Sequence, residues 1–245
     1  MLNSRLTTVV LAAALAIVLA GGAGLWYLFF REAGPAPVSL PSVAPSGAAA
    51  SGGASVTAGA PAGSGIALAT LDGTWNVDDS GSFVGYRVQE QLAGIGANTA
   101  VGRTSAVTGS VTFQGTQVTA IDMTADLTQL KSDSDQRDGQ LRHQAIETSQ
   151  FPTAAFKLTA PVQLGSVPAQ GQTVSATATG DLTIHGTTKS VQIPVKAQLS
   201  GDVVTVIGSI DIVFADYGFT GPSSFKVLSV EDHGIMEFQL LLRHA

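Results

Sequence analysis

The side chains best suited to acid–base or metal chemistry in this 245-residue chain are four histidines: His143, His185, His233 and His244. No two of them are three or four residues apart, so the spacing predicts no local metal site. His185 and Gly186 separate an apolar run on even numbers from one on odd numbers. That change of parity is typical of a tight reversal, where Gly supplies positive φ and His tolerates it. We therefore predict a hairpin turn at His185, and no metal or cofactor.

The densest polar cluster lies in a helix-like stretch from Ser132 to Ser149 and contains Arg137, Asp138, Arg142 and His143. Ser132 precedes Asp135 by three residues, which resembles a helix N-cap, and the basic residues come later, where positive charge is favoured. A short helix is the expected result. Its polar side chains have two interpretations: contacts with the head group of a ligand, or capping and surface ion pairs.

An acid and a phenol come together in the stretch FADYGFTGP, where Asp216 precedes Tyr217. A catalytic pair is one reading of this stretch, and a bulge or turn that ends a strand is the other. The chain has no G-x-S-x-G motif between a strand and a helix, no P-loop and no dinucleotide fingerprint. The sequence therefore predicts a protein that is not an enzyme.

Strands must position these groups, because alternation of apolar and polar residues dominates from residue 81 onward. The apolar members are mostly β-branched or aromatic, as a half-buried pleated surface requires. The predicted strands contain Val84 to Val88, Val107 to Phe113, Ile121 to Leu127, Ala154 to Leu158, Val174 to Ile184, Val191 to Leu199, Val204 to Phe214 and Met236 to Leu242.

About eight strands with one apolar face each must hide that face, and there is no helical layer of comparable size to cover it. Short Gly-containing turns favour antiparallel neighbours. We therefore predict an all-β, eight-stranded antiparallel barrel with one short helix. The interior of such a barrel is filled by side chains or holds one small ligand.

The N-terminal third differs from the rest of the chain. Leu6 to Phe30 carries no charge, and these 25 residues would extend roughly 37 Å as a helix, enough to cross a hydrocarbon core about 30 Å thick. We expect a single transmembrane anchor at residues 1–31, with a long signal sequence as the alternative. Residues 32–70, rich in Ala, Gly, Pro and Ser, are expected to be a disordered linker. Residues 71–245 then form an extracytoplasmic domain beside the cell membrane.

Charge and cysteine content exclude several classes of partner. The chain has 12 basic and 18 acidic residues, and removing Arg5, Arg31 and Glu32 leaves 10 and 17 in the folded domain, a net charge of −7. This excess of acidic residues argues against binding to nucleic acid and against binding to anionic membrane lipids through a polybasic surface. The absence of cysteine excludes disulfides, thiol catalysis and Cys-ligated zinc.

Five segments in a fixed order give the domain a family resemblance: TWNVDDSGSFVGYRV, VTGSVTFQG, RDGQLRHQAIETSQFPTAAFKL, ATGDLTIHGTTKSVQIPV and EFQLLL. Together they cover about residues 72–243, and on them the domain resembles the YceI-like family of lipid- or polyisoprenoid-binding proteins. The chain departs from the family pattern at Ile146 to Thr148 and at Val213 to Tyr217, and it adds the anchor and the linker.

The resemblance implies a lipocalin-like barrel whose elongated apolar cavity takes a long lipid. We therefore predict a membrane-tethered protein that carries or sequesters a polyisoprenoid, a quinone or a fatty-acyl chain. The expected lining is Tyr86, Val88, Phe113, Met123, Leu127, Phe156, Leu182, Ile193, Ile212, Phe214 and Phe238, with Arg137 and His143 at the head group.

Three alternatives stay open at this point. An envelope protein-interaction module would have a filled barrel and no lipid ligand. An isomerase or hydrolase acting on a bound lipid would depend on Asp216 and Tyr217. Two barrels could also pair as a homodimer.

Overall fold

The structure, a computed structural model, describes residues 35–41, 71–222 and 227–245. The predicted anchor at residues 1–31 lies outside these residues, as does most of the predicted linker at residues 32–70. Within the described part of the chain, no helix is both long and apolar enough to span a bilayer.

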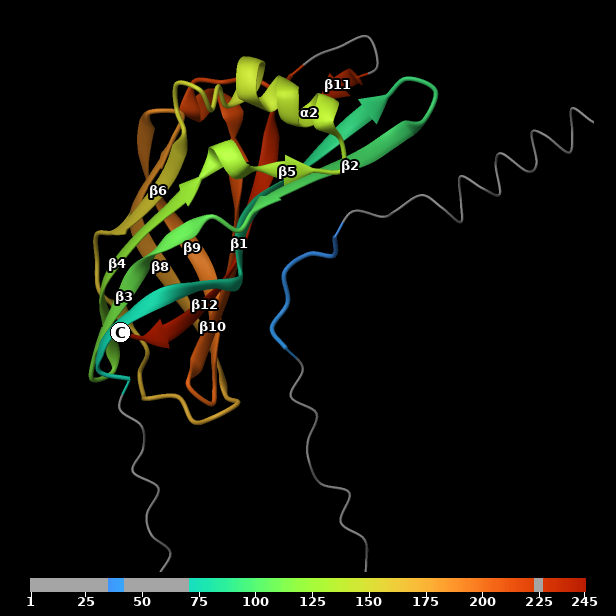
Figure 1. Cartoon of the computed structure of the whole chain (residues 1–245). Helices are drawn as coiled ribbons and strands as arrows, with labels where there is room; N and C mark the ends of the chain where they lie inside the picture. Colours follow the sequence, from blue (N-terminus) through green and yellow to red (C-terminus); the bar gives the residue numbers. More distant parts are fainter. Residues whose placement is uncertain (1–34, 42–70, 223–226) are drawn as a thin grey trace, which may run out of the picture. The chain divides into compact units, whose positions relative to one another are not determined.

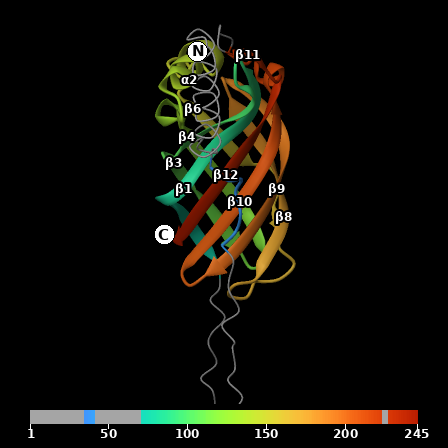
Figure 2. The same ribbon diagram turned by 90° about the vertical axis from the view of Figure 1, so that its right-hand side faces the viewer.

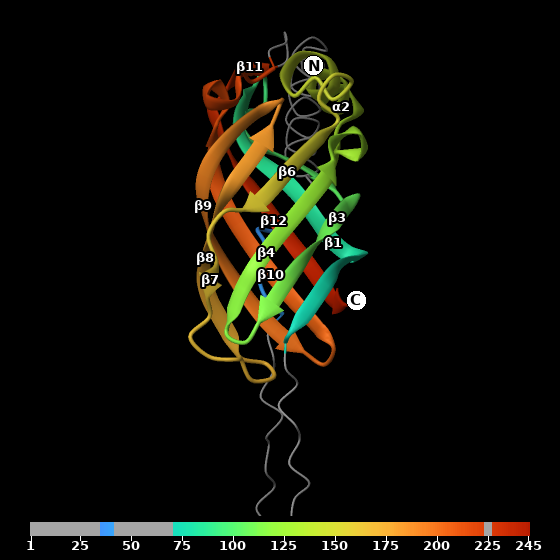
Figure 3. The ribbon, with the colours of Figure 1, turned by 90° about the vertical axis from the view of Figure 1, so that its left-hand side faces the viewer.

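Eight antiparallel strands form a closed barrel, as the alternation predicted (Figure 1). Around the wall the order is β12-β10-β9-β8-β6-β4-β3-β1, and β1 pairs with β12 to close the ring. These strands are β1 (Gly73–Leu92), β3 (Val107–Gln114), β4 (Gln117–Asp126), β6 (Thr153–Leu158), β8 (Thr173–Ile184), β9 (Thr187–Ser200), β10 (Val203–Val213) and β12 (His233–His244). Figure 2 shows β12 between β1 and β10, and Figure 3 shows β4 and β6 on the other side of the barrel.

The interior faces are those that the parity of the sequence predicted. On β10, Val204 and Ile212 are buried while Ser209 and Asp211 are exposed. On β12, Leu240 and Leu242 are buried among the residues of the main core. Period-2 alternation therefore brings one apolar stripe from every wall strand into a shared interior.

The strand β1 has different partners at the two ends of the wall. At the lower end, which carries the β3–β4 and β9–β10 turns, β3 pairs with Gly73–Asn76 of β1. At the upper end, Val84–Leu92 of β1 instead pairs with β2 (Gly96–Thr104), and this hairpin projects beyond the barrel (Figure 1). The pairing of β1 with β12 shifts register between Asp78 and Phe83, where β1 changes partner.

Three short strands extend this sheet. Strand β5 (Lys131–Ser132) pairs with β2, β7 (Val162–Gln163) pairs with β4, and β11 (Val227–Val230) pairs with β1. Strands β5 and β11 both add to the upper end, on the two sides of the β1–β2 hairpin. The upper rim is therefore built from short elements and loops rather than from continuous wall strands.

The predicted helix covers the upper end (Figure 1), but its start is not where the sequence placed it. Helix α2 (Asp135–Gln140) is capped by Ser134, whose side chain accepts from the Arg137 backbone N–H. Ser132 lies in β5, where its hydroxyl donates to Asp138 at 2.7 Å. A π-helical turn, η2 (Leu141–Ala145), continues the helix, and a 3-10 turn, η1 (Leu127–Gln129), precedes β5.

Both predicted reversals are present. His185 and Gly186 have φ of 52° and 69° between β8 and β9, as a type I′ hairpin turn requires. The FADYGFTGP stretch ends β10 with a 3-10 turn, η3 (Phe214–Tyr217), and Gly218 caps that turn with φ of 76°. The reversal is a helical turn rather than a bulge.

Candidate functional site

The barrel interior is hollow and consists of two cavities that share lining residues. The upper cavity has a volume of about 560 Å³ and the lower one about 150 Å³. Val84, Ala154 and Met236 line both. The two cavities therefore lie end to end along one apolar interior.

The lower cavity is lined by side chains of the main core, and none of its described lining residues is charged. Its walls come from every strand of the barrel. A charged ligand group would lose its hydration here without gaining a charged partner. A hydrocarbon chain has no such cost.

The upper cavity is also mainly apolar, but it has a polar edge formed by β1 and α2. Among its described lining residues only Glu90 and Arg137 are charged. Tyr86, Ser134, Gln136 and Gln140 add neutral polar groups. A molecule that spans both cavities would meet hydrocarbon at one end and polar atoms at the other.

The structure places most of the predicted lining at these cavities. The upper one contains Tyr86, Val88, Leu127, Arg137, Ile212 and Phe214. The lower one contains Phe113, Met123, Phe156, Leu182, Ile193 and Phe238. Contact of these residues with a ligand stays a prediction.

His143 is the exception. It is exposed on η2 and lines neither cavity. The π-helical turn directs Leu141 and Ala145 to the cavity, so the residues between them face outward. The interpretation of His143 as a head-group contact is therefore not supported by its position.

Several lining residues were missed by the sequence analysis. Ala93 and Ile95 belong to the β1–β2 hairpin, and Ile146 and Phe219 lie in loops, where period-2 alternation gives no signal. Glu90 is different, because it continues the even-numbered run of Tyr86 and Val88. Its parity could have placed it inside.

Arg137 is neutralised by carboxylates at the polar edge. Its Nη2 donates to Glu90 Oε1 at 2.6 Å, and its Nη1 pairs with Asp133. Glu90 Oε1 also accepts from Asn98 Nδ2 at 2.7 Å. The Glu90 side chain is 5% exposed, so this pair compensates a buried charge and links α2 to β1 and β2.

Tyr86 lies beside this pair and is held against β2. A Cβ on Gly102 would lie 2.4 Å from Tyr86 Cε1, so the ring fits only because that residue is glycine. The buried Tyr86 hydroxyl has no hydrogen-bond partner among the described residues. Burial raises the pKa of this phenol well above its ordinary value, and Asp138, Asp133 and Glu90 raise it further against the opposing effect of Arg137.

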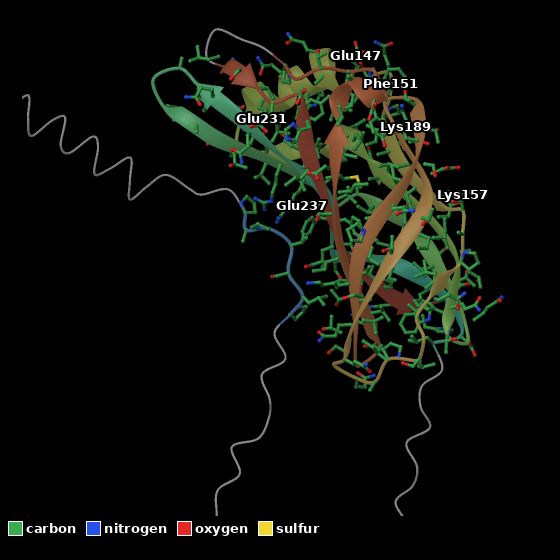
Figure 4. The ribbon with its side chains drawn as sticks, turned by 180° about the vertical axis from the view of Figure 1, so that it is seen from behind. Glu147, Phe151, Lys157, Lys189, Glu231 and Glu237 are labelled. Carbon is green, nitrogen blue, oxygen red and sulfur yellow. The ribbon has the colours of Figure 1, made fainter. Side chains whose placement is uncertain are left out.

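His185 connects three parts of the upper rim. Its Nδ1 donates to the Tyr217 carbonyl of η3, and its Nε2 lies 3.1 Å from Glu147 Oε2 in the loop after η2. The Phe151 ring lies 4.2 Å from the imidazole between centroids, and Figure 4 shows Glu147 and Phe151 together at this end. The predicted turn histidine therefore also fastens the loops that border the upper cavity.

A second buried ion pair lies where β1 changes partner. Glu237 of β12 is 1% exposed and pairs with Arg87 of β1 and Arg103 of β2, each at 2.7 Å. Arg103 also stacks over Phe83, 4.1 Å from the ring centroid. Glu237 lies in the wall rather than at the rim (Figure 4) and lines neither cavity. Its role is to hold β2, β1 and β12 together.

The candidate catalytic pair is not assembled at a cavity. Asp216 is exposed, with its carboxylate 3.8 Å from Lys189 Nζ, and Tyr217 is buried. Neither lines the upper or the lower cavity. Within the described ranges, no three histidine or acidic side chains converge as a metal site would require.

Comparison with solved structures identifies the fold. A polyisoprenoid-binding domain from Saccharophagus degradans, implicated in plant cell wall breakdown, is 19% identical with a TM-score of 0.56, covering 70% of this chain and 98% of that one. BcnA from Burkholderia cenocepacia is 22% identical with a TM-score of 0.53, covering 67% and 98%. A comparison with curated proteins gave no match.

The family comparison covers almost all of the barrel. The YceI-like domain matches residues 75–241, from the start of β1 to near the end of β12. This range includes the upper cavity, most of the lining of the lower cavity, the helix that covers the upper end and the hairpin turn at His185. The chain therefore belongs to the YceI-like domain family.

Proposed function

We propose that this protein is a lipid carrier or sequestering protein that holds one long apolar chain along the barrel interior. The observation that carries the proposal is the hollow interior with two adjoining cavities, of which the lower has no described charged lining and the upper has a polar edge. Burial of each CH₂ unit is worth about 0.8 kcal/mol, so an apolar tail needs few polar contacts to bind. The volume of the upper cavity falls within the range of about 300–1,000 Å³ typical of ligand sites.

The comparisons add support for the ligand class. The Saccharophagus degradans structure is of a polyisoprenoid-binding domain with the same fold, so a polyisoprenoid or prenylated quinone is the preferred ligand and a fatty-acyl chain the next. The protein-interaction alternative assumed a filled barrel, whereas this barrel is hollow. Binding rather than catalysis is the proposed activity.

Tethering is the second part of the proposal. We place the anchor at residues 1–31 and the flexible linker at residues 32–70 on the basis of their sequence. The barrel would then stay near the membrane on its extracytoplasmic face, close to a source of lipid. Protease treatment of intact cells and of lysed cells, followed by detection of the barrel, tests this topology, and light scattering tests homodimer formation.

The test of binding is native mass spectrometry and organic extraction of the full chain, purified from a membrane-containing host. We expect an apolar molecule at about one per chain, because a barrel of about eight strands has room for one ligand. An empty barrel that also rejects added quinones and polyprenols would contradict the proposal.

A larger side chain at the wall that both cavities share gives a sharper test. Ala154 lines both cavities, so Ala154→Phe should divide the interior and lower lipid occupancy at least about tenfold, because several CH₂ units would lose their site. Ala120→Phe is the matched control, since Ala120 is exposed on β4 and lines neither cavity. Equal occupancy in both variants would show that the lipid does not pass Ala154.

A further inference from the structure

The outer face of β10 carries a buried apolar side chain that the barrel does not account for. Odd-numbered residues of this strand face outward, and Ser209, Asp211 and Val213 are exposed, Val213 at 45%. Ile207 faces the same way but is only 7% exposed. Among the described residues it belongs to neither core cluster and lines neither cavity. A segment outside the wall must therefore cover it.

The described segment Pro37–Pro41 lies where such a cover is needed. It belongs to the same compact unit as the barrel. Figure 2 shows it, in blue, in front of β10 and β12, and Figure 4 shows it outside the wall near Glu237. Glu237 is paired with Ser209 of β10, two residues after Ile207. The two views therefore place the segment along the part of the outer wall that contains Ile207.

The exposure of the segment alternates. Val38 and Leu40 are half-buried, whereas Pro37, Ser39 and Pro41 are exposed. Alternate side chains of an extended chain point the same way, and so short a segment cannot bury both of them by itself. Val38 and Leu40 therefore face another surface together. The two prolines restrict the unbound chain, which lowers the entropy lost when the segment docks.

The outer wall offers an apolar surface for these two side chains. Gln239 of β12 is paired with Ile207 of β10 on one side and with Phe83 of β1 on the other. Leu241, the next outward residue of β12, is half-buried, as is Phe83. We propose that Pro37–Pro41 is a strap that docks on this surface through Val38 and Leu40 and covers Ile207.

A docked strap shortens the tether between barrel and membrane, and this consequence rests on the proposed anchor at residues 1–31. The chain from residue 31 to Pro37 extends at most about 20 Å. A flexible linker that ran from residue 32 to residue 70 would have an average end-to-end distance of roughly 35 Å and could stretch several times further. Docking therefore keeps the barrel closer to a source of lipid than the length of the linker suggests.

The chain has no cysteine, so single introduced thiols can test the strap on the full chain in a non-ionic detergent. Ile207→Cys reports on the covered position. Ser209→Cys is the matched control, because Ser209 faces the same way on the same strand and is exposed. We expect a maleimide to label position 207 at least about tenfold more slowly than position 209, since two apolar side chains hold the cover in place. Equal rates would overturn the proposal.

A strap variant assigns this protection to the segment. Val38→Ser combined with Leu40→Ser should raise the labelling rate at position 207 at least about tenfold and leave the rate at position 209 unchanged. Val56→Ser is the control, because it replaces an apolar residue of the predicted linker outside the strap, and it should leave position 207 protected. Slow labelling at position 207 in the strap variant would show that another segment covers Ile207, which overturns the proposal.

The shorter tether is measured separately in phosphatidylcholine vesicles that contain an acceptor lipid. A donor dye on Ser190→Cys, at an exposed position of β9, should transfer less energy to the acceptor in the strap variant than in the parent chain. Equal transfer would overturn the shortening of the tether. A chain that does not associate with vesicles at all would contradict the proposed anchor, whereas thiol protection at position 207 would still decide whether the strap docks.

Discussion

The two ends of the barrel are built by different rules. At the lower end, β3 pairs with the start of β1, β7 pairs with the start of β4, and alternation places apolar side chains inside. At the upper end, β1 leaves β3 to pair with β2, and α2, η2 and η3 border the cavity instead. Among the described lining residues, charged groups are found only at this second end. The wall strands supply an uncharged lining to the lower cavity, whereas the charged residues of the upper cavity come from β1 and α2.

The largest predicted difference between the two ends is in how much a truncated leucine lowers the free energy of unfolding. Leu242 is 0% exposed in the lower core, and Leu242→Ala should lower the free energy of unfolding by about 3 kcal/mol, as expected for a truncated buried leucine. Leu141→Ala is the matched variant, because Leu141 is half-buried and faces the upper cavity. We expect it to cost less than about 1 kcal/mol in ligand-free protein, since the space beside it is already empty. Urea unfolding measures both, and equal losses would contradict the distinction.

A smaller and local effect should follow from loosening the rim. Glu147→Gln removes the carboxylate beside His185 Nε2, which should cost about 1 kcal/mol or less. Amide hydrogen exchange should then rise several-fold in η3 and stay unchanged in β3 and β4, because His185 fastens only the upper loops. Glu231→Gln is the control, as Glu231 pairs with His233 where both side chains are about half exposed (Figure 4). A uniform rise in exchange would mean that the contact supports the whole barrel.

The smallest effect concerns the outer surface at the junction of β1 and β12. Hydrogen bonds from the Ser80 hydroxyl, and then from Arg243, lower the pKa of Asp78 from 3.8 to about 2. The ionised carboxylate is thus favoured in the folded state. Its contribution to stability is present above about pH 4 and is lost as the pH falls through 2. NMR titration of the carboxyl carbon checks the value, and Ser80→Ala should raise it. A pKa near 4 in the wild type would contradict these contacts.

Much of the fold followed from the sequence. The parity of apolar residues predicted the eight wall strands, and the change of parity at His185 predicted a hairpin turn. Helix formation was also foreseen, but the cap was placed at Ser132 rather than Ser134. Both serines precede acidic residues at similar spacing, so only the pairing of Ser132 in β5 excluded it from the helix.

The candidate site was predicted less completely. Twelve of the thirteen residues expected at the ligand line one of the cavities, because those on strands follow from parity. His143 does not, because its direction depends on a π-helical turn that sequence spacing does not reveal. Arg137 was expected as a cation for a head group, and its pairing with Glu90, 47 residues earlier in the chain, changes that role.

The sequence by itself determined the class of fold and the apolar character of the interior, because period-2 alternation leaves each strand only one face that can be buried. Only the tertiary structure decided that the interior is hollow and that its polar edge is already neutralised. Alternation is the same for a packed core and for a cavity, since the difference depends on the distance between opposite walls. The unpaired state of the Tyr86 hydroxyl likewise depends on which groups from β2, β5 and α2 reach it, and long-range contacts alone set this.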